Sequence, residues 1–229
     1  MIVMQYANNG SLLSYLNQNI NELTWRMKLK HLERIANYLH DIHSAGLVHC
    51  ALHGGNIVID STRFGAESFI CELGPSRSVN SRQQNSTVRG VLSFIAPEVF
   101  HTRKYTQKSD VYSFGLIMYL VATGEPPFRD RQFDSNLICD IMGGLRPSMP
   151  DSAPEEYKKL AERCCDADPG MRPDAKTLFL SFGTLINIVG KDNSDDSVWN
   201  IIYHNDVTYT GDLLKPKNSY NLDSAADTC

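Results

Sequence analysis

The segment His49–Ile59, HCALHGGNIVI, is the stretch on which the interpretation of this sequence turns. A helix-like apolar segment precedes it, and the β-branched run Ile57–Ile59 ends it. The segment has the outline of a catalytic loop whose working residues have been exchanged for inert ones, Cys50 and Ala51. It therefore raises the question of whether this protein is an enzyme or keeps only the scaffold of one.

Composition limits the class of protein. With 229 residues, of which 42% are hydrophobic, the chain is expected to form one cored domain with at most an appendage. A net charge of −4 gives no electrostatic footprint for nucleic acid or an anionic membrane. The longest apolar run, Phe114–Ala122, is far shorter than the ~20 residues of a membrane helix. The N-terminus does not resemble a signal peptide, and the six cysteines show no metal-like or framework spacing. We expect a cytoplasmic chain.

Charge divides the chain into two parts. From Lys191 onward there are three lysines against seven aspartates, which accounts for the whole net charge of −4. This part is rich in Asn, Asp and Ser and shows no sustained period. Its only apolar cluster is Val198, Trp199, Ile201 and Ile202. We therefore predict a folded domain over residues 1–189 and a polar, acidic tail or linker over residues 190–229.

Hydrophobic periodicity predicts that the first part is mainly helical. Ser11 can cap a short helix, and Thr24 can cap a longer one that ends at Gly46. The longer helix is indicated by apolar residues at three- and four-residue steps, namely Leu29, Leu32, Ile35, Leu39 and Ile42. The segment Asp110–Thr123 is apolar on nearly every side, which predicts a helix buried in the core. Two further helices are expected to start at Pro154 and Asp174.

A small amount of β structure is expected beside these helices. Ile57–Ile59 and Phe69–Cys71 read as a hairpin around the turn residues Asp60–Gly65. Residues 72–98 are polar, rich in Ser and Arg, and without a period. They therefore predict a long loop, which in a compact domain suggests function. The predicted fold class is mainly α, with small β-hairpins.

Five motifs in one order carry a resemblance to a known family. HCALHGGNI is followed by CELG, by APE at Ala96–Glu98, by SDVYSFG, and by MRP at residues 171–173. They resemble H-R-D-L-x-x-x-N, D-F-G, A-P-E, D-x-[WY]-S-x-G and the late Arg-Pro of protein kinases, most closely those of the tyrosine kinase-like group of serine/threonine kinases. The resemblance covers about Met1–Val189. It implies a kinase C-lobe with its hinge, and no N-lobe.

The resemblance implies a nucleotide site that is only half built. Kinases bind ATP and magnesium under a glycine-rich loop, with a strand lysine on the phosphates, and neither is found upstream of the hinge. The family pattern assigns hinge backbone groups of Gln5 and Ala7 to the adenine, with Val58 supporting the ring. We expect this chain to bind Mg-ATP weakly or not at all.

The implied catalytic residues are also depleted. Ala51 stands at the position of the catalytic base, and Cys50 replaces the arginine that in many kinases pairs with a phosphorylated activation loop. Asn56 keeps the family's magnesium-binding asparagine, although it could equally be kept for hydrogen bonds within the loop. Glu72 replaces the metal-binding Asp of D-F-G and is one methylene longer. Leu73 replaces the Phe and is expected to keep an apolar plug.

Other retained motif residues are structural in the family. The resemblance implies a buried ion pair between Glu98 and Arg172, whose loss on one side would cost about 3–5 kcal/mol. It also implies that Asp110 bonds the backbone of the catalytic loop. These residues would be retained without catalysis.

Two alternatives concern other kinds of site. A histidine and cysteine cluster could suggest zinc, although His49 matches a packed loop residue of the family. The members of the cluster are His40, His43, His49, Cys50 and His53. The hydroxyl residues of the predicted loop could be phosphorylated, or could simply be solvated. They are Ser76, Ser78, Ser81, Ser86 and Thr87, which lie among Arg77, Arg82 and Arg89.

Three functional hypotheses follow. The chain is a catalytically defective pseudokinase that binds another protein, such as an active kinase. Alternatively, it is an active ATP-dependent serine/threonine kinase seen as an N-terminally truncated chain. A third reading is a truncated product with no independent function.

Overall fold

The computed structural model describes residues 6–62, 65–79, 88 and 90–189. The first half of this part contains α1 Leu12–Asn19, α2 Trp25–Ser44, β1 Leu47–Val48, β2 Ile57–Thr62, β3 Gly65–Ile70 and β4 Arg77–Ser78. The second half contains the 3₁₀ turn η1 Leu92–Phe94, α3 Pro97–Thr102, α4 Gln107–Thr123, α5 Ser135–Met142, α6 Glu155–Cys164, the 3₁₀ turn η2 Pro169–Met171 and α7 Ala175–Val189. The fold is mainly α with two small antiparallel sheets, as predicted.

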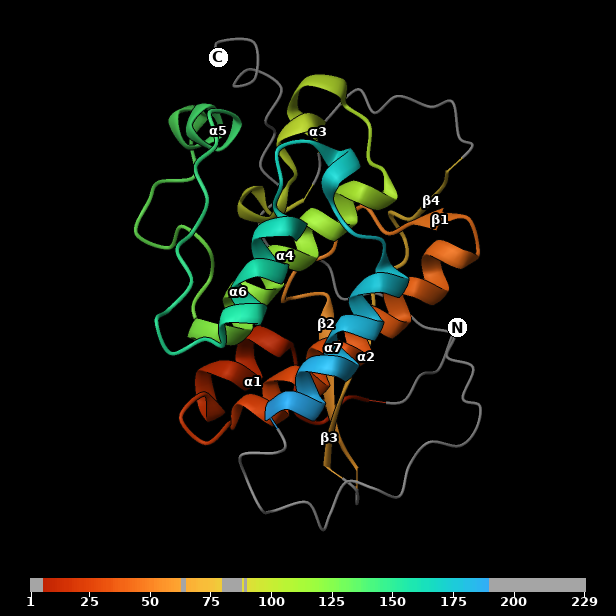
Figure 1. Ribbon diagram of the computed structural model, residues 1–229. Coiled ribbons are helices and arrows are strands. Elements are labelled where there is room, and N and C mark those ends of the chain that lie inside the picture. Colours follow the sequence, from red (N-terminus) through yellow and green to blue (C-terminus); the bar gives the residue numbers. More distant parts are fainter. Residues whose placement is uncertain (1–5, 63–64, 80–87, 89, 190–229) are drawn as a thin grey trace.

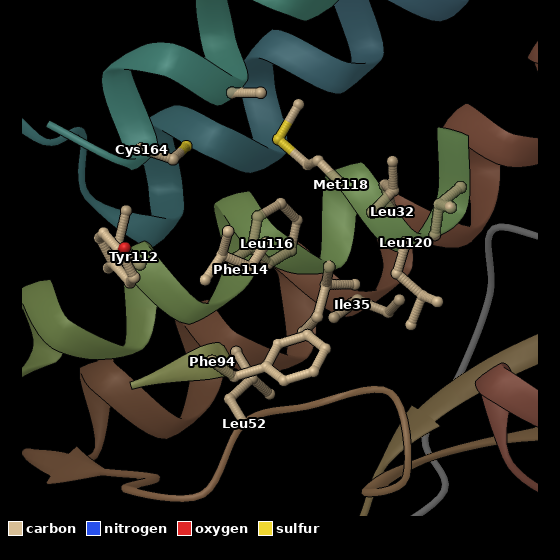
Figure 2. Close-up of a cluster of buried hydrophobic side chains, with 14 of the residues drawn as sticks. Leu32, Ile35, Leu52, Phe94, Tyr112, Phe114, Leu116, Met118, Leu120 and Cys164 are labelled. Carbon is tan, nitrogen blue, oxygen red and sulfur yellow. The ribbon is translucent and has the colours of Figure 1, made fainter. Parts of the chain in front are cut away.

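Helix α4 forms the centre of the core. Phe114, Leu116, Ile117 and Leu120 are each at most 1% exposed, which confirms the predicted buried helix. It begins three residues before the predicted start, because Thr106 and a serine three residues later form a capping box. Figure 1 shows α4 crossing the middle of the molecule beside α6. In Figure 2, side chains of α2, of the loop after β1 and of η1 converge on the same cluster.

The predicted caps of α1 and α2 are confirmed. The Ser11 and Thr24 side chains each accept a hydrogen bond from the backbone three residues on. Gly46 follows α2 with φ of 72°, a left-handed conformation that favours glycine at the end of a helix. The long helix α2 packs along α7, so that the two lie side by side in Figure 1. The Asp174 side chain caps α7 by accepting a hydrogen bond from Thr177 N at 2.7 Å.

The predicted hairpin is present, but its turn is shorter than the predicted Asp60–Gly65. Strand β2 continues to Thr62 and β3 begins at Gly65, so Asp60 and Ser61 belong to the sheet rather than to a turn. The physical reason lies in the N-terminal segment. Asn8 N donates to Asp60 Oδ1 at 3.2 Å, and Ser61 N donates to Asn8 Oδ1 at 2.9 Å. These bonds hold polar residues in an extended strand.

The region predicted as one loop over residues 72–98 is partly structured. It contains β4, which pairs with β1, and η1, and α3 begins at its end. Helices α3 and α5 were not predicted. The proposed tail, residues 190–229, lies outside the described residues, so the domain boundary after Val189 stays a prediction. Within the described ranges, no helix is both long and apolar enough to cross a membrane.

Candidate functional site

The Asp110 carboxylate, in the first turn of α4, organises the candidate catalytic loop. Its Oδ2 accepts a hydrogen bond from His49 N at 2.7 Å, and its Oδ1 accepts one from Cys50 N at 3.0 Å. His43 Nε2, from α2, lies 2.9 Å from Oδ2. The predicted tie between Asp110 and the loop backbone is therefore confirmed. Both carboxylate oxygens are engaged in holding three parts of the chain together.

His49 is fully buried and is held as the neutral Nε2–H tautomer. Ala51 N donates to His49 Nδ1 at 3.3 Å, so this nitrogen is an acceptor. The other nitrogen, Nε2, donates to the carbonyl oxygen of Cys71 at 3.0 Å. Burial lowers the pKa of His49, against the opposing effect of the Asp110 charge. The residue joins the catalytic loop to the end of the hairpin, which is the packing role expected for it.

Cys50 lies deep at the start of the loop. Its backbone has φ of 68°, a left-handed conformation that non-glycine residues seldom adopt. Two hydrogen bonds maintain this geometry, from Cys50 N to Asp110 and from the thiol to Val48 O at 3.5 Å. Burial raises the pKa of the thiol to about 12, so it stays protonated and unreactive.

Asn56 closes the loop from within. Its Nδ2 donates to the carbonyl oxygen of Ala51 at 2.9 Å, which is the loop-bonding role that the sequence left open. Asn56 O also accepts a hydrogen bond from Cys71 N at 2.9 Å. The asparagine therefore fixes the loop and its junction with the hairpin. Its side-chain oxygen takes no part in these two bonds and is the atom that a cation would use.

A small pocket lies between the loop, α4 and the segment before α3. Of the described residues that line it, only Asp110 carries a carboxylate. Ala51 and His53 of the loop line it, together with Gly90 and Val91 of the segment before α3. The full lining is Cys50, Ala51, Leu52, His53, Gly90, Val91, Phe94, Ile95, Ala96, Tyr105, Ser109, Asp110 and Ser113. Sequence reasoning missed the contribution of Val91 and Tyr105, because the long loop carries no period that places them.

His53 is neutral beside this pocket. Its Nδ1 accepts a hydrogen bond from Gly55 N at 3.0 Å, and its ring packs near Phe94 with 6.1 Å between centroids. Burial lowers the pKa of His53 to about 4, with a smaller contribution from His49. At neutral pH the ring therefore supplies no positive charge to the pocket.

The zinc alternative is not supported. His43, His49 and His53 have the partners described above, and His40 Nδ1 lies 3.3 Å from Ser44 Oγ. In the described part of the chain, no group of three His, Cys, Asp or Glu side chains is placed to hold a metal ion.

Glu72 and Leu73 follow the hairpin. Glu72 is half-buried and has φ of 62°, a strained backbone for a side chain of this size. The prediction that Leu73 keeps an apolar plug is wrong, because its side chain is 51% exposed. No apolar surface of the described residues covers it. Ser76, Arg77 and Ser78 lie at the start of the segment that follows, with β4 paired to β1. The remaining hydroxyl and arginine residues of the proposed phosphorylated loop lie outside the described residues.

Two of the three proposed adenine-binding residues, Ala7 and Val58, lie in or beside β2. Ser11 bridges to Val58, and Asn9 N donates to Ile59 O at 3.0 Å, so the segment after Ala7 runs along this strand. The Ala7 carbonyl accepts a hydrogen bond from Gly10 N at 3.3 Å and is thus part of a turn. The structure brings Ala7 and Val58 into one region. Gln5 lies outside the described residues.

Arg172 and Glu98 form the predicted buried ion pair. Arg172 is 1% exposed, and its two terminal nitrogens donate to the two Glu98 carboxylate oxygens at 2.7 and 2.8 Å. Its Nε donates to Asp166 O at 2.9 Å, and its guanidinium lies 5.1 Å from the Tyr112 ring centroid. The pair joins the start of α3 to the segment before α7. Sequence reasoning missed the stacking on Tyr112.

These residues fit Mg-ATP poorly. Asn56 and Glu72 offer one amide oxygen and one carboxylate, whereas magnesium takes six oxygens and relies on substrate phosphates to complete the set. Phosphate binding needs cations or a cradle of backbone N–H groups. Around the loop, His53 is neutral and the Asp110 oxygens face backbone N–H groups and His43. The hydrogen bonds of the site hold the catalytic loop in place, but its side chains provide few groups that could bind a nucleotide.

Comparison with known proteins identifies the family. The family model described as protein tyrosine and serine/threonine kinase matches residues 1–182. The chain belongs to this family, whose members generally use ATP and magnesium.

Three similar relatives come from Dictyostelium discoideum, and each is named a probable serine/threonine-protein kinase. One is 25% identical over 225 residues, which covers 93% of this chain and 12% of the relative. A second is 32% identical over 192 residues, covering 81% and 18%. A third is 34% identical over 188 residues, covering 77% and 10%. The chain thus spans less than a fifth of the length of these relatives.

Proposed function

We propose that this chain is a catalytically defective kinase domain that acts by binding another protein, such as an active kinase. One observation carries the proposal. Among the residues that the structure describes, Asp110 is the only carboxylate that lines the pocket, and both of its oxygens accept or face hydrogen-bond partners, namely the backbone of His49 and Cys50 and the His43 ring. A catalytic base needs a free lone pair directed at the proton that it accepts. Asp110 has a structural role instead, and Ala51 offers a methyl group.

The contacts that hold the loop around the missing catalytic base are all formed in the described residues. The loop keeps its bonds to α4 and to the hairpin, and the Glu98–Arg172 pair is fully formed. A buried and fully bonded loop is costly to dismantle, so its retention is explained by folding alone. A kinase surface without kinase chemistry can still present a binding face to a partner.

A second candidate function is an active serine/threonine kinase of which this chain is one part. It is favoured by the oxygen ligands retained at Asn56 and Glu72 and by the names of the longer relatives. In that case another carboxylate must reach the pocket, because Asp110 is engaged. The two candidates differ in what they predict for phosphotransfer.

A radiolabelled ATP assay separates them. We expect no transfer above background from the chain or from Ala51→Asp, and at most weak transfer from the chain fused to a kinase N-lobe. The catalytic base, the phosphate-binding lysine and the glycine-rich loop act as a unit, so restoring one of them alone does not position the γ-phosphate. If only the fusion that also carries Ala51→Asp is active, the chain is a kinase relic whose role rests on its surface and on binding. Transfer by the unmodified chain that is abolished by Glu72→Ala would overturn the defective-kinase proposal.

Nucleotide affinity provides a second test. We expect calorimetry with Mg-ATP to show weak or no binding, because a floor of Ala7 and Val58 leaves much of the ligand in water, whereas good pockets bury about 70–90% of it. Low-micromolar affinity that is lost in both Asn56→Ala and Glu72→Ala would establish these residues as magnesium ligands and favour the active candidate.

A further inference from the structure

The turn that leads into α1 contains the one Asn–Gly pair in the sequence, Asn9–Gly10. Gly10 N donates to Ala7 O at 3.3 Å, which closes a turn with Asn8 and Asn9 at its corner. Gly10 has φ of 70°, a left-handed conformation that glycine adopts without strain. Asn9 is partly exposed to water. We call residues 7–10 the hinge turn.

An asparagine that is followed by glycine can lose its side-chain amide without an enzyme. The backbone nitrogen of the glycine attacks Cγ of the asparagine, and a cyclic imide forms. Glycine favours this step because it has no side chain to hinder the nitrogen and because its backbone is free to reach the geometry of attack. The two reacting atoms belong to neighbouring residues, so no entropy is lost in bringing them together.

The structure leaves the Gly10 nitrogen open to this reaction. Its bond to Ala7 O is longer than the usual range of about 2.7–3.2 Å for N–H···O bonds, so the N–H group is held weakly. A Cβ atom placed on Gly10 would find its nearest neighbours, in the Ser14 side chain, only at 3.9 Å, so the space beside it is open. Asn8 differs, because a residue with a side chain follows it and Ser61 N donates to its Oδ1 at 2.9 Å.

Asn9 and Gly10 also fasten the hinge turn to β2. Asn9 N donates to Ile59 O at 3.0 Å, and Ile59 N donates to Gly10 O at 2.8 Å. The Asn9 side chain adds a bond from Nδ2 to Ser61 Oγ at 2.7 Å. The link between Asn9 and Gly10 therefore lies between two backbone hydrogen bonds to one residue of β2. Both bonds can form only while this link has its ordinary length.

We propose that Asn9 is converted spontaneously to aspartate and isoaspartate, and that the isoaspartate form detaches the hinge turn from β2. The bond from Gly10 N to Asn9 Cγ forms as the Cγ–Nδ2 bond breaks. Nδ2 leaves as ammonia and takes the proton of the Gly10 N–H group. Water then opens the imide at one of its two carbonyl carbons, which gives aspartate or isoaspartate.

The isoaspartate product changes the backbone itself. Its main chain runs through Cβ and Cγ, so residue 9 contributes one more carbon to the chain than before. The two backbone bonds to Ile59 then lose their common register, and the carboxylate that remains cannot donate to Ser61 as Nδ2 does. Loss of ammonia makes the change one-way. It therefore sets a lifetime for the junction between the hinge turn and the hairpin.

Peptide mapping of the aged full chain tests the proposal. The chain is kept at body temperature and mildly alkaline pH, and is then digested with pepsin at low pH. We expect the peptide that contains Asn9 to gain the mass that corresponds to replacement of NH by O, with isoaspartate at this position, while Asn8 stays intact. Hydrogen exchange should show that the Ile59 amide is protected in the fresh chain and unprotected in the isoaspartate fraction.

Two variants serve as controls. Asn9→Gln keeps an amide but would have to form a larger ring, so it should stay intact and keep Ile59 protected after the same incubation. Freshly prepared Asn9→Asp has the new charge without the extra carbon, so it should also keep Ile59 protected. This comparison assigns the detachment to the altered backbone.

Two outcomes would overturn the proposal. In the first, Asn9 stays intact in the folded chain over a period in which the urea-unfolded chain is converted, because the turn then protects it. In the second, the isoaspartate fraction keeps the Ile59 amide protected. Neither outcome bears on the phosphotransfer assay, so this proposal and that of a defective kinase domain fail separately.

Discussion

Arg172 shows how a single buried charge is made tolerable. Its guanidinium donates to both Glu98 oxygens, to Asp166 O and to Lys108 O, and its flat face lies over Tyr112. Four of the five N–H groups of the guanidinium donate in these contacts. Removing the side chain would leave Glu98 and two backbone carbonyls without their partner in a region from which water is largely excluded.

We therefore expect Arg172→Ala to lower the free energy of unfolding by about 3 kcal/mol, near the lower end of the range for one-sided loss of a buried pair, because the Glu98 side chain is 19% exposed. Arg172→Lys should recover part of this loss, since lysine keeps the charge but not the two-pronged geometry. Urea denaturation measures both.

The control is an ion pair of the same chemistry at the surface. Arg129 and Glu125 are paired, with side chains 63% and 50% exposed. Arg129→Ala should cost less than about 1 kcal/mol, because water screens such pairs. Equal losses at Arg129 and Arg172 would contradict the structural role assigned to the buried pair.

At the scale of elements, the contact between α4 and α6 depends on a residue without a side chain. A Cβ atom added at Gly115 would lie 2.6 Å from Cys165 Sγ and 2.8 Å from Cys164 Cβ. Both distances are shorter than any real carbon contact, so the two helices could not approach as they do. By contrast, a Cβ at Gly183 on α7 would meet only the flexible end of Glu33, at 3.4 Å.

The same substitution should therefore have opposite effects in the two helices. Gly115→Ala is expected to destabilise the protein by about 1–3 kcal/mol, since the core must shift to accept a methyl group. Gly183→Ala should stabilise it by up to about 1 kcal/mol, because alanine is the better helix former. Thermal unfolding of both variants gives the sign of each effect. If both stabilise, the close approach of α4 and α6 is not what the structure describes.

At the scale of the whole molecule, several histidines are buried in their neutral form. His31 is 5% exposed, lies 2.7 Å from Ser68 Oγ through Nδ1, and has a pKa lowered to about 4, mainly by burial. His53 also has a pKa of about 4, and the pKa of His49 is lowered. They lie between α2 and the hairpin and in the catalytic loop. Protonation of any of them would place a positive charge in the interior, which burial opposes.

Stability should consequently fall in mild acid. A histidine whose pKa is lower in the folded protein than its ordinary 6.5 stabilises the fold fully above pH 6.5 and progressively less as the pH falls toward 4. Each such residue adds a slope of up to about 1.4 kcal/mol per pH unit in this window. Urea denaturation between pH 7 and pH 4 measures the slope. His31→Gln should reduce it, and a flat profile would contradict neutral burial.

The sequence was sufficient to predict those features of the fold and site that a local pattern or an ordered motif specifies. The caps at Ser11 and Thr24, the buried α4 and the Glu98–Arg172 pair follow from periodicity or from ordered motifs. The hairpin is longer than predicted because Asp60 and Ser61 have turn composition, yet they pair with β3 and are bonded by the distant Asn8 and Asn9.

Other features have no local signal. Helix α5 has eight residues, SNLICDIM, and is too short to establish a period between the flanking turn residues. The exposure of Leu73 depends on whether another surface covers it, which its neighbours in sequence do not specify. Likewise, the pocket unites Ala51 with Val91 and Tyr105 from segments that carry no shared pattern.

The way in which Asp110 holds the candidate loop has a consequence for how such a chain evolves. The carboxylate grips the N–H groups of positions 49 and 50, which every residue except proline possesses. Asp110 therefore fixes the backbone of positions 49 and 50 whichever side chains they carry, while the His49 ring and the Asn56 amide hold other parts of the loop. Residue changes are then tolerated unequally, because Cys50 is buried with φ of 68°, whereas the Ala51 methyl group takes no part in these hydrogen bonds. Selection on stability alone thus constrains Asp110 and Cys50 more than Ala51.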